Sequence, residues 1–183
     1  MFSRAEWPRS EEWPTIDKLE FDPRPILEAL IRHAVDFVLI GGLAGTAHGS
    51  AYPTYDVDVA YERSSENLRR LAAALTELDA TLRGAPPGLP FRLDAETLRA
   101  GMSFTFDTRL GSLDILGEPA GAPRYGEIRT AGVSGELWGV TLRIASLDHL
   151  IAMKEAAGRT KDKLMASEYR IISDLQRAGD EPG

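Results

Sequence analysis

The sequence predicts one α+β domain (α/β mixed). Short apolar runs bounded by turn residues alternate along the chain with longer segments that have the apolar spacing of helices. The chain has 183 residues, of which 43% are hydrophobic, so it is long enough for one substantial core and short for two.

We expect three segments along the chain: an extended N-terminal arm over 1–23, one domain over 24–178 and a disordered tail over 179–183. In the arm, Trp7 and Trp13 each precede a proline, and residues before proline are pushed toward extended conformations. The two Glu-Trp-Pro triplets recur at a spacing of six residues, which is too short for a repeat architecture.

The composition excludes several classes of protein. The chain has no cysteine, so it can form neither a disulfide framework nor a thiolate metal site. No apolar run approaches the ~18 residues of a membrane span, and no signal peptide is recognisable, so we expect a cytoplasmic protein without membrane contact. The net charge of -7 argues against a protein coated by nucleic acid and leaves room for a local basic patch.

Helices are predicted where apolar residues recur at steps of three and four behind a capping residue. The first begins at Asp22-Pro23 and ends near residue 34. The others are predicted over 43–48, behind a cap at Ser64 or Ser65, over 147–157 behind Ser146, and in a last segment with an apolar stripe of Leu164, Ile171, Ile172 and Leu175.

Strands are predicted where short apolar or alternating runs lie between turn residues. They cover residues 37–40, 54–61, 80–83, 102–106 and 112–116, followed by a hairpin over 136–144 that turns near Gly139. Residues 117–135 are rich in Gly, Pro and Ala, and we expect a long connection there.

Asp56 and Asp58 are candidate metal ligands because they stand on alternate residues of an apolar run. Side chains of a strand alternate between its faces and rise ~3.3 Å per residue, so the two acids share one face about 7 Å apart. Carboxylates held this way repel each other, and a cation between them relieves the repulsion. Mg²⁺ prefers such hard oxygen ligands. The alternative is a half-exposed edge strand whose acids lie in water.

Two further features extend this candidate site. Gly41-Gly42 follows a buried strand and precedes a short helix, where backbone N–H groups and the helix dipole favour phosphate, although a plain tight turn explains the pair equally well. In the run Leu113-Asp114-Ile115 the acid points to the face opposite its apolar neighbours. Three acids on neighbouring strands suggest a metal site.

Basic residues near the C-terminal helices are candidates for binding an anion. Lys154 continues the inward stripe of Leu150 and Ile151, so it either extends past the core to solvent or points into a polar site. Arg159 and Lys161 lie at the start of the last helix, where basic residues oppose the helix dipole. A bound anion such as a triphosphate would compensate this cost.

These residues together resemble the minimal nucleotidyltransferases of the DNA polymerase β superfamily, most of all the bacterial AbiE-type and MenT-type toxins. The resemblance covers about residues 26–175. Its motifs are Gly41-Gly42, Thr54-x-Asp56-x-Asp58, Leu113-Asp114-Ile115-Leu116 and the segment from Leu150 to Asp162, which is the most specific of the four.

The resemblance implies a polymerase-β-like fold, a mixed β-sheet flanked by helices, with Asp56, Asp58 and Asp114 as catalytic ligands of two Mg²⁺ ions, or of Mn²⁺. Asp114 would join the ion that activates the attacking hydroxyl. Lys154 would act on the phosphates and count as catalytic, and Asp162 would orient Lys161 or a neighbour. The nucleotide would be bound by Gly41, Gly42, Thr54, Lys154, Arg159, Lys161 and Asp162.

Three positions depart from the pattern of these relatives. Tyr52 stands where many have an arginine, which puts one phosphate contact in doubt. Thr160 replaces a proline and Met165 replaces an acid, and we expect these to concern a helix start and a surface more than the chemistry. None of the three removes a carboxylate.

The resemblance implies transfer of a nucleoside monophosphate from an NTP to an acceptor hydroxyl, with release of pyrophosphate. The acceptor would be RNA, in particular the tRNA 3′ end, and the protein would be the toxin of a toxin–antitoxin pair. A kinase-like or binding antitoxin is a further expected partner, with Thr54 as the position for phosphorylation. The alternative for Thr54 is that its hydroxyl simply hydrogen-bonds the turn before the strand. The alternatives are a small-molecule (antibiotic-type) nucleotidyltransferase and a non-catalytic binding module, against which three converging acids argue.

Overall fold

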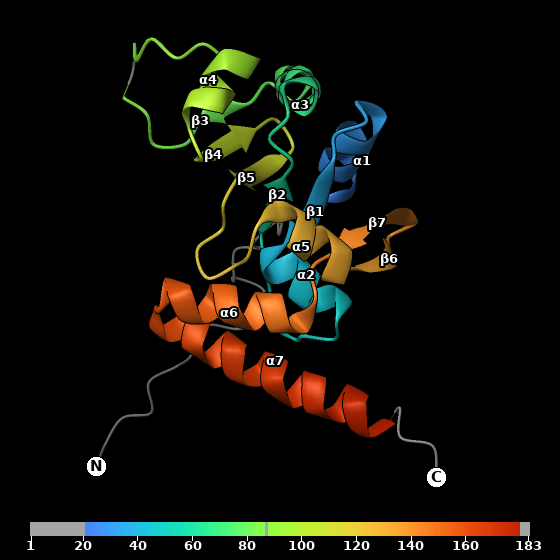
Figure 1. Cartoon of the computed structure of the whole chain (residues 1–183). Coiled ribbons are helices and arrows are strands. Elements are labelled where there is room, and N and C mark those ends of the chain that lie inside the picture. Colours follow the sequence, from blue (N-terminus) through green and yellow to red (C-terminus); the bar gives the residue numbers. More distant parts are fainter. Residues whose placement is uncertain (1–20, 87, 180–183) are drawn as a thin grey trace, which may run out of the picture.

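A seven-stranded sheet in the order β3-β4-β5-β2-β1-β7-β6 organises the fold (Figure 1). It is seen in a computed structural model that describes residues 21–86 and 88–179. The strands are β1 (Phe37–Ile40), β2 (Asp56–Tyr61), β3 (Thr81–Leu82), β4 (Ser103–Thr108), β5 (Gly111–Leu116), β6 (Val133–Leu137) and β7 (Val140–Ile144). Most of the predicted arm, with both of its tryptophans, and most of the predicted tail lie outside the described residues.

Within the described residues, seven helices accompany the sheet, so the predicted mixture of helices and strands is confirmed. They are α1 (Arg24–Arg32), α2 (Gly41–Ala47), α3 (Ser65–Glu77), α4 (Ala95–Ala100), α5 (Tyr125–Ala131), α6 (Leu147–Ala157) and α7 (Thr160–Gly179). α6 and α7 pack against each other at one end of the molecule, and α3 and α4 contact each other at the opposite end (Figure 1).

The sheet is mixed, and β2 lies in its interior. β2 pairs antiparallel with β1 and parallel with β5, while β1 pairs parallel with β7 on its other side. The predicted hairpin forms between β6 and β7 and turns at Trp138 and Gly139, both at positive φ. Because β2 has a neighbour on each side, the edge-strand alternative for its two acids is wrong.

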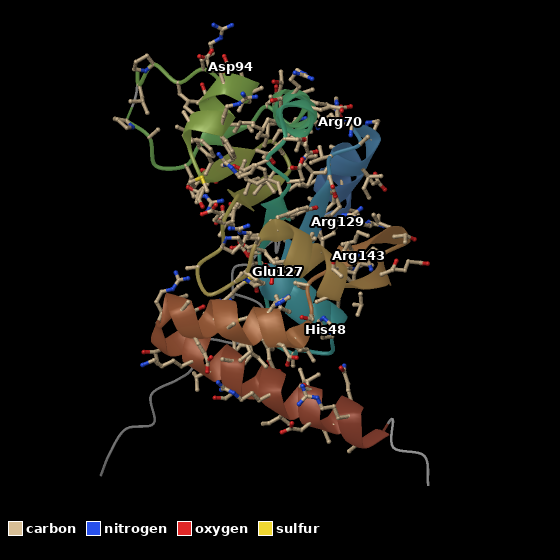
Figure 2. All side chains as sticks on the ribbon, in the orientation of Figure 1. His48, Arg70, Asp94, Glu127, Arg129 and Arg143 are labelled. Carbon is tan, nitrogen blue, oxygen red and sulfur yellow. The ribbon has the colours of Figure 1, made fainter. Side chains whose placement is uncertain are left out.

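The apolar side chains of β2 and β5 point away from the acids and into the core. Val57 and Val59 of β2 and Leu113 and Ile115 of β5 are completely buried, and they join the same apolar cluster as the inward residues of α1 and α3. The outer side of α3 is polar, with Arg70 exposed and paired with Glu66 (Figure 2). The alternation of apolar and acidic residues along β2 therefore separates a core face from a polar face.

Helix ends follow their predicted capping residues in two cases. The Ser64 side chain accepts a hydrogen bond from the Asn67 N–H at 3.2 Å, and that of Ser146 accepts one from the His149 N–H at 3.4 Å. α1 begins at Arg24, one residue later than expected. The Arg24 N–H donates a hydrogen bond to Asp22 Oδ1 at 3.0 Å.

Two expectations about the elements are wrong, and one helix was not anticipated. The connection expected over 117–135 contains α5 and the start of β6, and α4 forms in a stretch for which no helix was predicted. On α7, Leu164, Ile171 and Leu175 are exposed, and the buried face is formed instead by Met165, Ala166 and Tyr169. The long helix thus turns a different side toward α6 and the rest of the fold than its aliphatic residues indicate.

None of the helices in the described part of the chain combines the length and the apolar character that a membrane crossing needs.

Candidate active site

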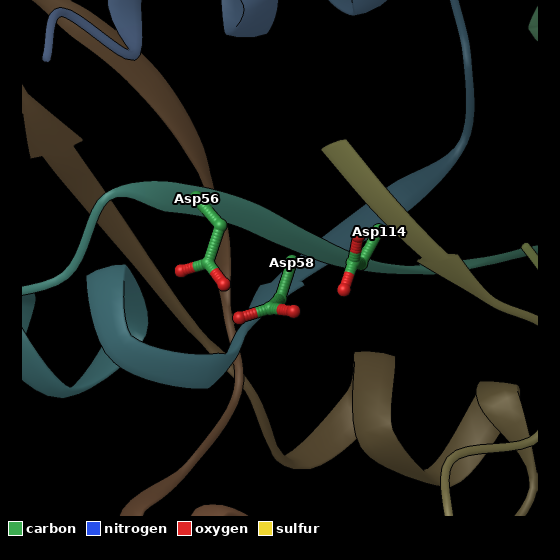
Figure 3. Close-up of side chains that lie close together, drawn as sticks. All are labelled: Asp56, Asp58 and Asp114. Atoms are coloured by element: carbon green, nitrogen blue, oxygen red, sulfur yellow. The ribbon is translucent and has the colours of Figure 1, made fainter. Parts of the chain in front are cut away.

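Three carboxylates from two neighbouring strands meet on the polar face of the sheet. Asp56 and Asp58 lie on β2, and Asp58 is in register with Asp114 of β5. One oxygen from each carboxylate lies within 4.8 Å of the others. Figure 3 shows the three side chains pointing to the same side of the strands. Carboxylate oxygens in this arrangement are suitable ligands for a divalent cation such as Mg²⁺ or Mn²⁺.

The electrostatics of the cluster favour a bound cation. Burial, followed by the neighbouring charges of Asp56 and Asp114, raises the pKa of Asp58 from 3.8 to about 7. Burial also raises the pKa of Asp114, although the charge of Arg83 opposes this. Without a cation, full ionisation of the three acids is therefore unfavourable, and a divalent ion supplies the missing positive charge.

Gly41 and Gly42, which begin α2, allow the chain to pass very close to the acids. Gly41 has a φ of 67°, and a Cβ atom there would lie 1.9 Å from Asp58 Oδ2. A Cβ atom on Gly42 would lie 2.5 Å from Thr54 Oγ1. The two glycines are required here because any side chain would displace a residue of the site.

Thr54 lies just before β2 and is tied to the acid cluster. Its hydroxyl donates a hydrogen bond to Asp56 Oδ1 at 2.6 Å. The loop before it is held by Glu168 of α7, which accepts hydrogen bonds from the Ser50 hydroxyl at 2.5 Å and from the Ala51 N–H at 3.0 Å. α7 therefore helps to position the loop that carries Thr54.

Lys154 of α6 and Arg159, in the turn between α6 and α7, both contact Asp162. Lys154 Nζ lies 3.3 Å from Asp162 Oδ1, and Arg159 Nε donates to Asp162 Oδ2 at 2.7 Å. Burial works against the charge of Asp162, yet the hydrogen bonds from Arg159 and Lys154 keep its pKa below the usual range. Asp162 is thus paired with Lys154 and Arg159, where the expectation was that it orients Lys161 or a neighbour.

A cavity of about 370 Å³ connects the acids to the bases. It is lined by four acids, four bases and a few small or apolar residues: Asp56, Asp58, Asp114, Asp162, Arg83, Lys154, Arg159, Lys161, Gly42, Pro53, Thr54 and Met165. Of the residues predicted for the site, Gly41 is the one that lies beside this cavity rather than on its wall. A polar cavity with both signs of charge is suited to a phosphorylated ligand together with a cation.

Arg83 is a residue of the cavity that the sequence did not reveal. It follows β3, and its Nη2 atom lies 2.9 Å from Asp114 Oδ1, while its Nε atom lies 3.0 Å from Asp107 Oδ1. The Phe106 carbonyl accepts a further hydrogen bond from Nη2 at 2.8 Å. The only available signal was the predicted strand over 80–83, which did not indicate a partner.

Met165 also differs from expectation. It is 3% exposed and lines the cavity, so it does not lie on a surface remote from the chemistry. Thr160 does stand at a helix start, as the first residue of α7.

No family model and no curated protein matches this chain. Among solved structures, it is similar to a proposed nucleotidyltransferase from Thermotoga maritima, with 14% identity and a TM-score of 0.50 over 80% of this chain and 88% of that one. It is also similar to the lincosamide antibiotic adenylyltransferase LnuA in its lincomycin-bound form, with 12% identity and a TM-score of 0.56 over 81% and 94%. At these identities the likeness shows the fold, and the predicted nucleotidyltransferase fold is confirmed.

Proposed function

We propose that this protein is a metal-dependent nucleotidyltransferase, which transfers a nucleoside monophosphate from an NTP to an acceptor hydroxyl and releases pyrophosphate. The observation that carries the proposal is the cavity itself, in which three acids with oxygens within 4.8 Å of one another face three bases from α6, α7 and the turn between these helices. A purely binding module on the same fold has no need of three converging carboxylates, so we set that alternative aside.

The acid cluster fits the divalent ions that the resemblance implies, because it offers only carboxylate oxygens and carries an excess of negative charge. Asp56, Asp58 and Asp114 would hold two Mg²⁺ or Mn²⁺ ions. When bound, two ions in such a site stabilise the entering and the leaving oxygens of an in-line displacement.

The remaining residues of the cavity bind and orient the two substrates. Lys154 and Arg159, held in place by Asp162, neutralise the phosphates and the charge that develops on the leaving pyrophosphate. Gly42 and Thr54 line the same cavity, where they would contact the nucleotide, and Lys161 adds a further positive charge. The acceptor hydroxyl would enter on the side of Asp114, which Arg83 holds in place.

For the acceptor, we propose the 3′ end of tRNA, with the protein acting as the toxin of a toxin–antitoxin pair. This part rests on the sequence resemblance. An antitoxin kinase could act on Thr54, where a phosphate would bring ≈ −1.5 to −2 charges beside Asp56 and stop the reaction.

A hydroxylated small molecule is the second candidate for the acceptor. It is favoured by the surroundings of Asp114, where Asp107 adds negative charge and Arg83 is already paired with both acids. Such a surface suits a neutral or cationic acceptor better than a polyanion. The structural similarity to LnuA, which was solved with lincomycin, supports the same candidate.

One experiment tests the function and separates the two acceptors. The protein is incubated with each labelled NTP, Mg²⁺ and either total tRNA or lincomycin, with Asp58→Asn as the control. Label on tRNA from the wild type alone supports the first candidate, and label on lincomycin supports the second. No pyrophosphate release under any of these conditions would contradict a nucleotidyltransferase.

A growth assay tests the toxin role separately. Bacteria express the wild type, Asp58→Asn or Thr54→Glu, and growth is followed beside transfer in vitro. We expect the wild type alone to be toxic and active. A harmless but active wild type would favour the small-molecule acceptor, and a fully active Thr54→Glu variant would argue against control at Thr54.

A further inference from the structure

A second, smaller cavity opens beside the candidate active site and is mainly apolar. It has a volume of about 160 Å³ and lies between the end of β5, the loop that follows it, and α6. Its apolar walls are formed by Leu116, Pro119 and Ala120 on one side and by Leu150, Met153 and Ala157 on the other. We call this cavity the apolar slot.

Both walls of the slot are fixed by the packing of α6 and of the loop after β5. Leu150, Met153 and Ala157 stand at helical spacing with Lys154, so one face of α6 forms the first of the two walls. The opposite wall is held against the helix by Gly121, where a Cβ atom would lie 2.4 Å from the Ala152 carbonyl oxygen. The loop therefore contacts α6 at Gly121 and leaves the slot open next to it.

The slot is continuous with the phosphate side of the larger cavity. Both cavities are lined by Asp58, Lys154, Arg159 and Asp162. In contrast, Asp114 and Arg83, on the acceptor side, line the larger cavity and not the slot. A ligand that places phosphate against Lys154 can therefore extend into the slot without crossing the path of the acceptor.

We propose that the apolar slot binds the nucleobase of the NTP. The inference rests on the proposed function. It gives a binding site to the nucleobase, for which the charged cavity offers none. The side chains that line the slot alone are apolar, so they recognise the base through burial of its ring faces rather than through side-chain hydrogen bonds. They thus add affinity for an NTP over its bare triphosphate.

The test compares ATP with inorganic tripolyphosphate, each titrated with Mg²⁺ by calorimetry. Ala120→Phe and Ala157→Phe fill the slot from its two walls, and both positions are exposed, so the core is not disturbed. Ala178→Phe, exposed near the end of α7 and remote from both cavities, is the matched control. Tripolyphosphate binding reports that each variant is folded and that the phosphate site is intact.

We expect the wild type and the control to bind ATP roughly tenfold or more tightly than tripolyphosphate, since a buried ring contributes about 1.4 kcal/mol or more. Both filled variants should bind tripolyphosphate normally and lose the preference for ATP. Filled variants that keep the preference would overturn the assignment of the slot while leaving the proposed function intact. A wild type that binds neither ligand would contradict the proposed function and the slot together.

Discussion

Asp58 is the residue at which the charge balance of the candidate site is decided. It lies between Asp56 on its own strand and Asp114 on the next, and Gly41 approaches its carboxylate from α2. Burial and these two acids make its ionised form unfavourable in the absence of a cation. Substitutions of this one residue therefore report on metal binding, on repulsion within the cluster and on catalysis.

Replacing Asp58 by asparagine should abolish transfer, by ~10²-fold or more, without unfolding the protein, because a metal ligand is lost while repulsion among the acids is relieved. Mg²⁺ should raise the melting temperature of the wild type more than that of the variant, by ordinary ligand linkage. Pyrophosphate release and thermal unfolding measure the two effects. Equal shifts with Mg²⁺ would place the ion elsewhere.

The raised pKa of Asp58 also predicts how the stability of the metal-free protein changes with pH. The folded protein keeps the Asp58 proton up to about pH 7, whereas the unfolded chain loses it near 3.8. The folded state thus binds more protons between these two pKa values. The contribution of Asp58 to the free energy of unfolding is therefore complete below the pKa of the unfolded chain and is lost as the pH rises to the pKa of the folded protein. Urea unfolding in EDTA should show a steeper loss of stability in the wild type than in Asp58→Asn. Parallel pH profiles would mean that Asp58 is ionised throughout.

Lys154 is expected to act on the phosphates both in the bound substrate and in the transition state. Lys154→Ala should weaken NTP binding and lower the transfer rate, each roughly tenfold or more. Lys154→Met is the matched variant, because it keeps the length of the side chain and removes its charge. If Lys154→Met is more stable than the wild type and equally active, the lysine only extends past the core toward solvent.

At the scale of elements, the strand-to-helix turn at the start of α2 brings the backbone against the acid cluster. Gly41→Ala should destabilise the protein on the order of 1–3 kcal/mol and displace Asp58, since the left-handed φ and the 1.9 Å approach both exclude a Cβ atom. Gly126→Ala in α5 is the control, because a Cβ atom there meets nothing within 4 Å. Urea unfolding and Mg²⁺ binding measure the difference, and equal stability of the two variants would contradict the close approach.

The sequence predicts elements best where a single local rule decides their structure. The alternation around Asp56 and Asp58 and the cap at Ser146 depend on near neighbours, and the structure follows them. α5 was missed because Gly, Pro and Ala dominate its surroundings, while Ile128 anchors the helix through a tertiary contact. The buried face of α7 was misjudged because Tyr169, whose ring packs against Gly45 of α2, is buried in place of the aliphatic residues.

The same distinction applies to the candidate site. Asp114 and Lys154 could be proposed from their own strand and helix, because each interrupts an apolar pattern. Arg83 could not, because its role depends on a register between β3, β4 and β5 that brings it to Asp114. The apolar slot likewise exists only where a loop and a helix meet, and no local pattern marks its walls.

At the scale of the whole molecule, the two halves of the candidate site lie on elements that differ in their stability against local unfolding. The acids stand on β2 and β5, which have strands on both sides, whereas Lys154 and Arg159 belong to the helical pair at one end of the molecule. Interior strands open only in global unfolding, while peripheral helices can detach at lower cost. The site should therefore fail in two stages as urea is added. NTP binding should be lost first, at the urea concentration at which the amides of α6 lose their protection from hydrogen exchange. Mn²⁺ binding should persist until the amides of β2 also lose their protection. Simultaneous loss of both ligands and of all protected amides would show that sheet and helices open as one unit.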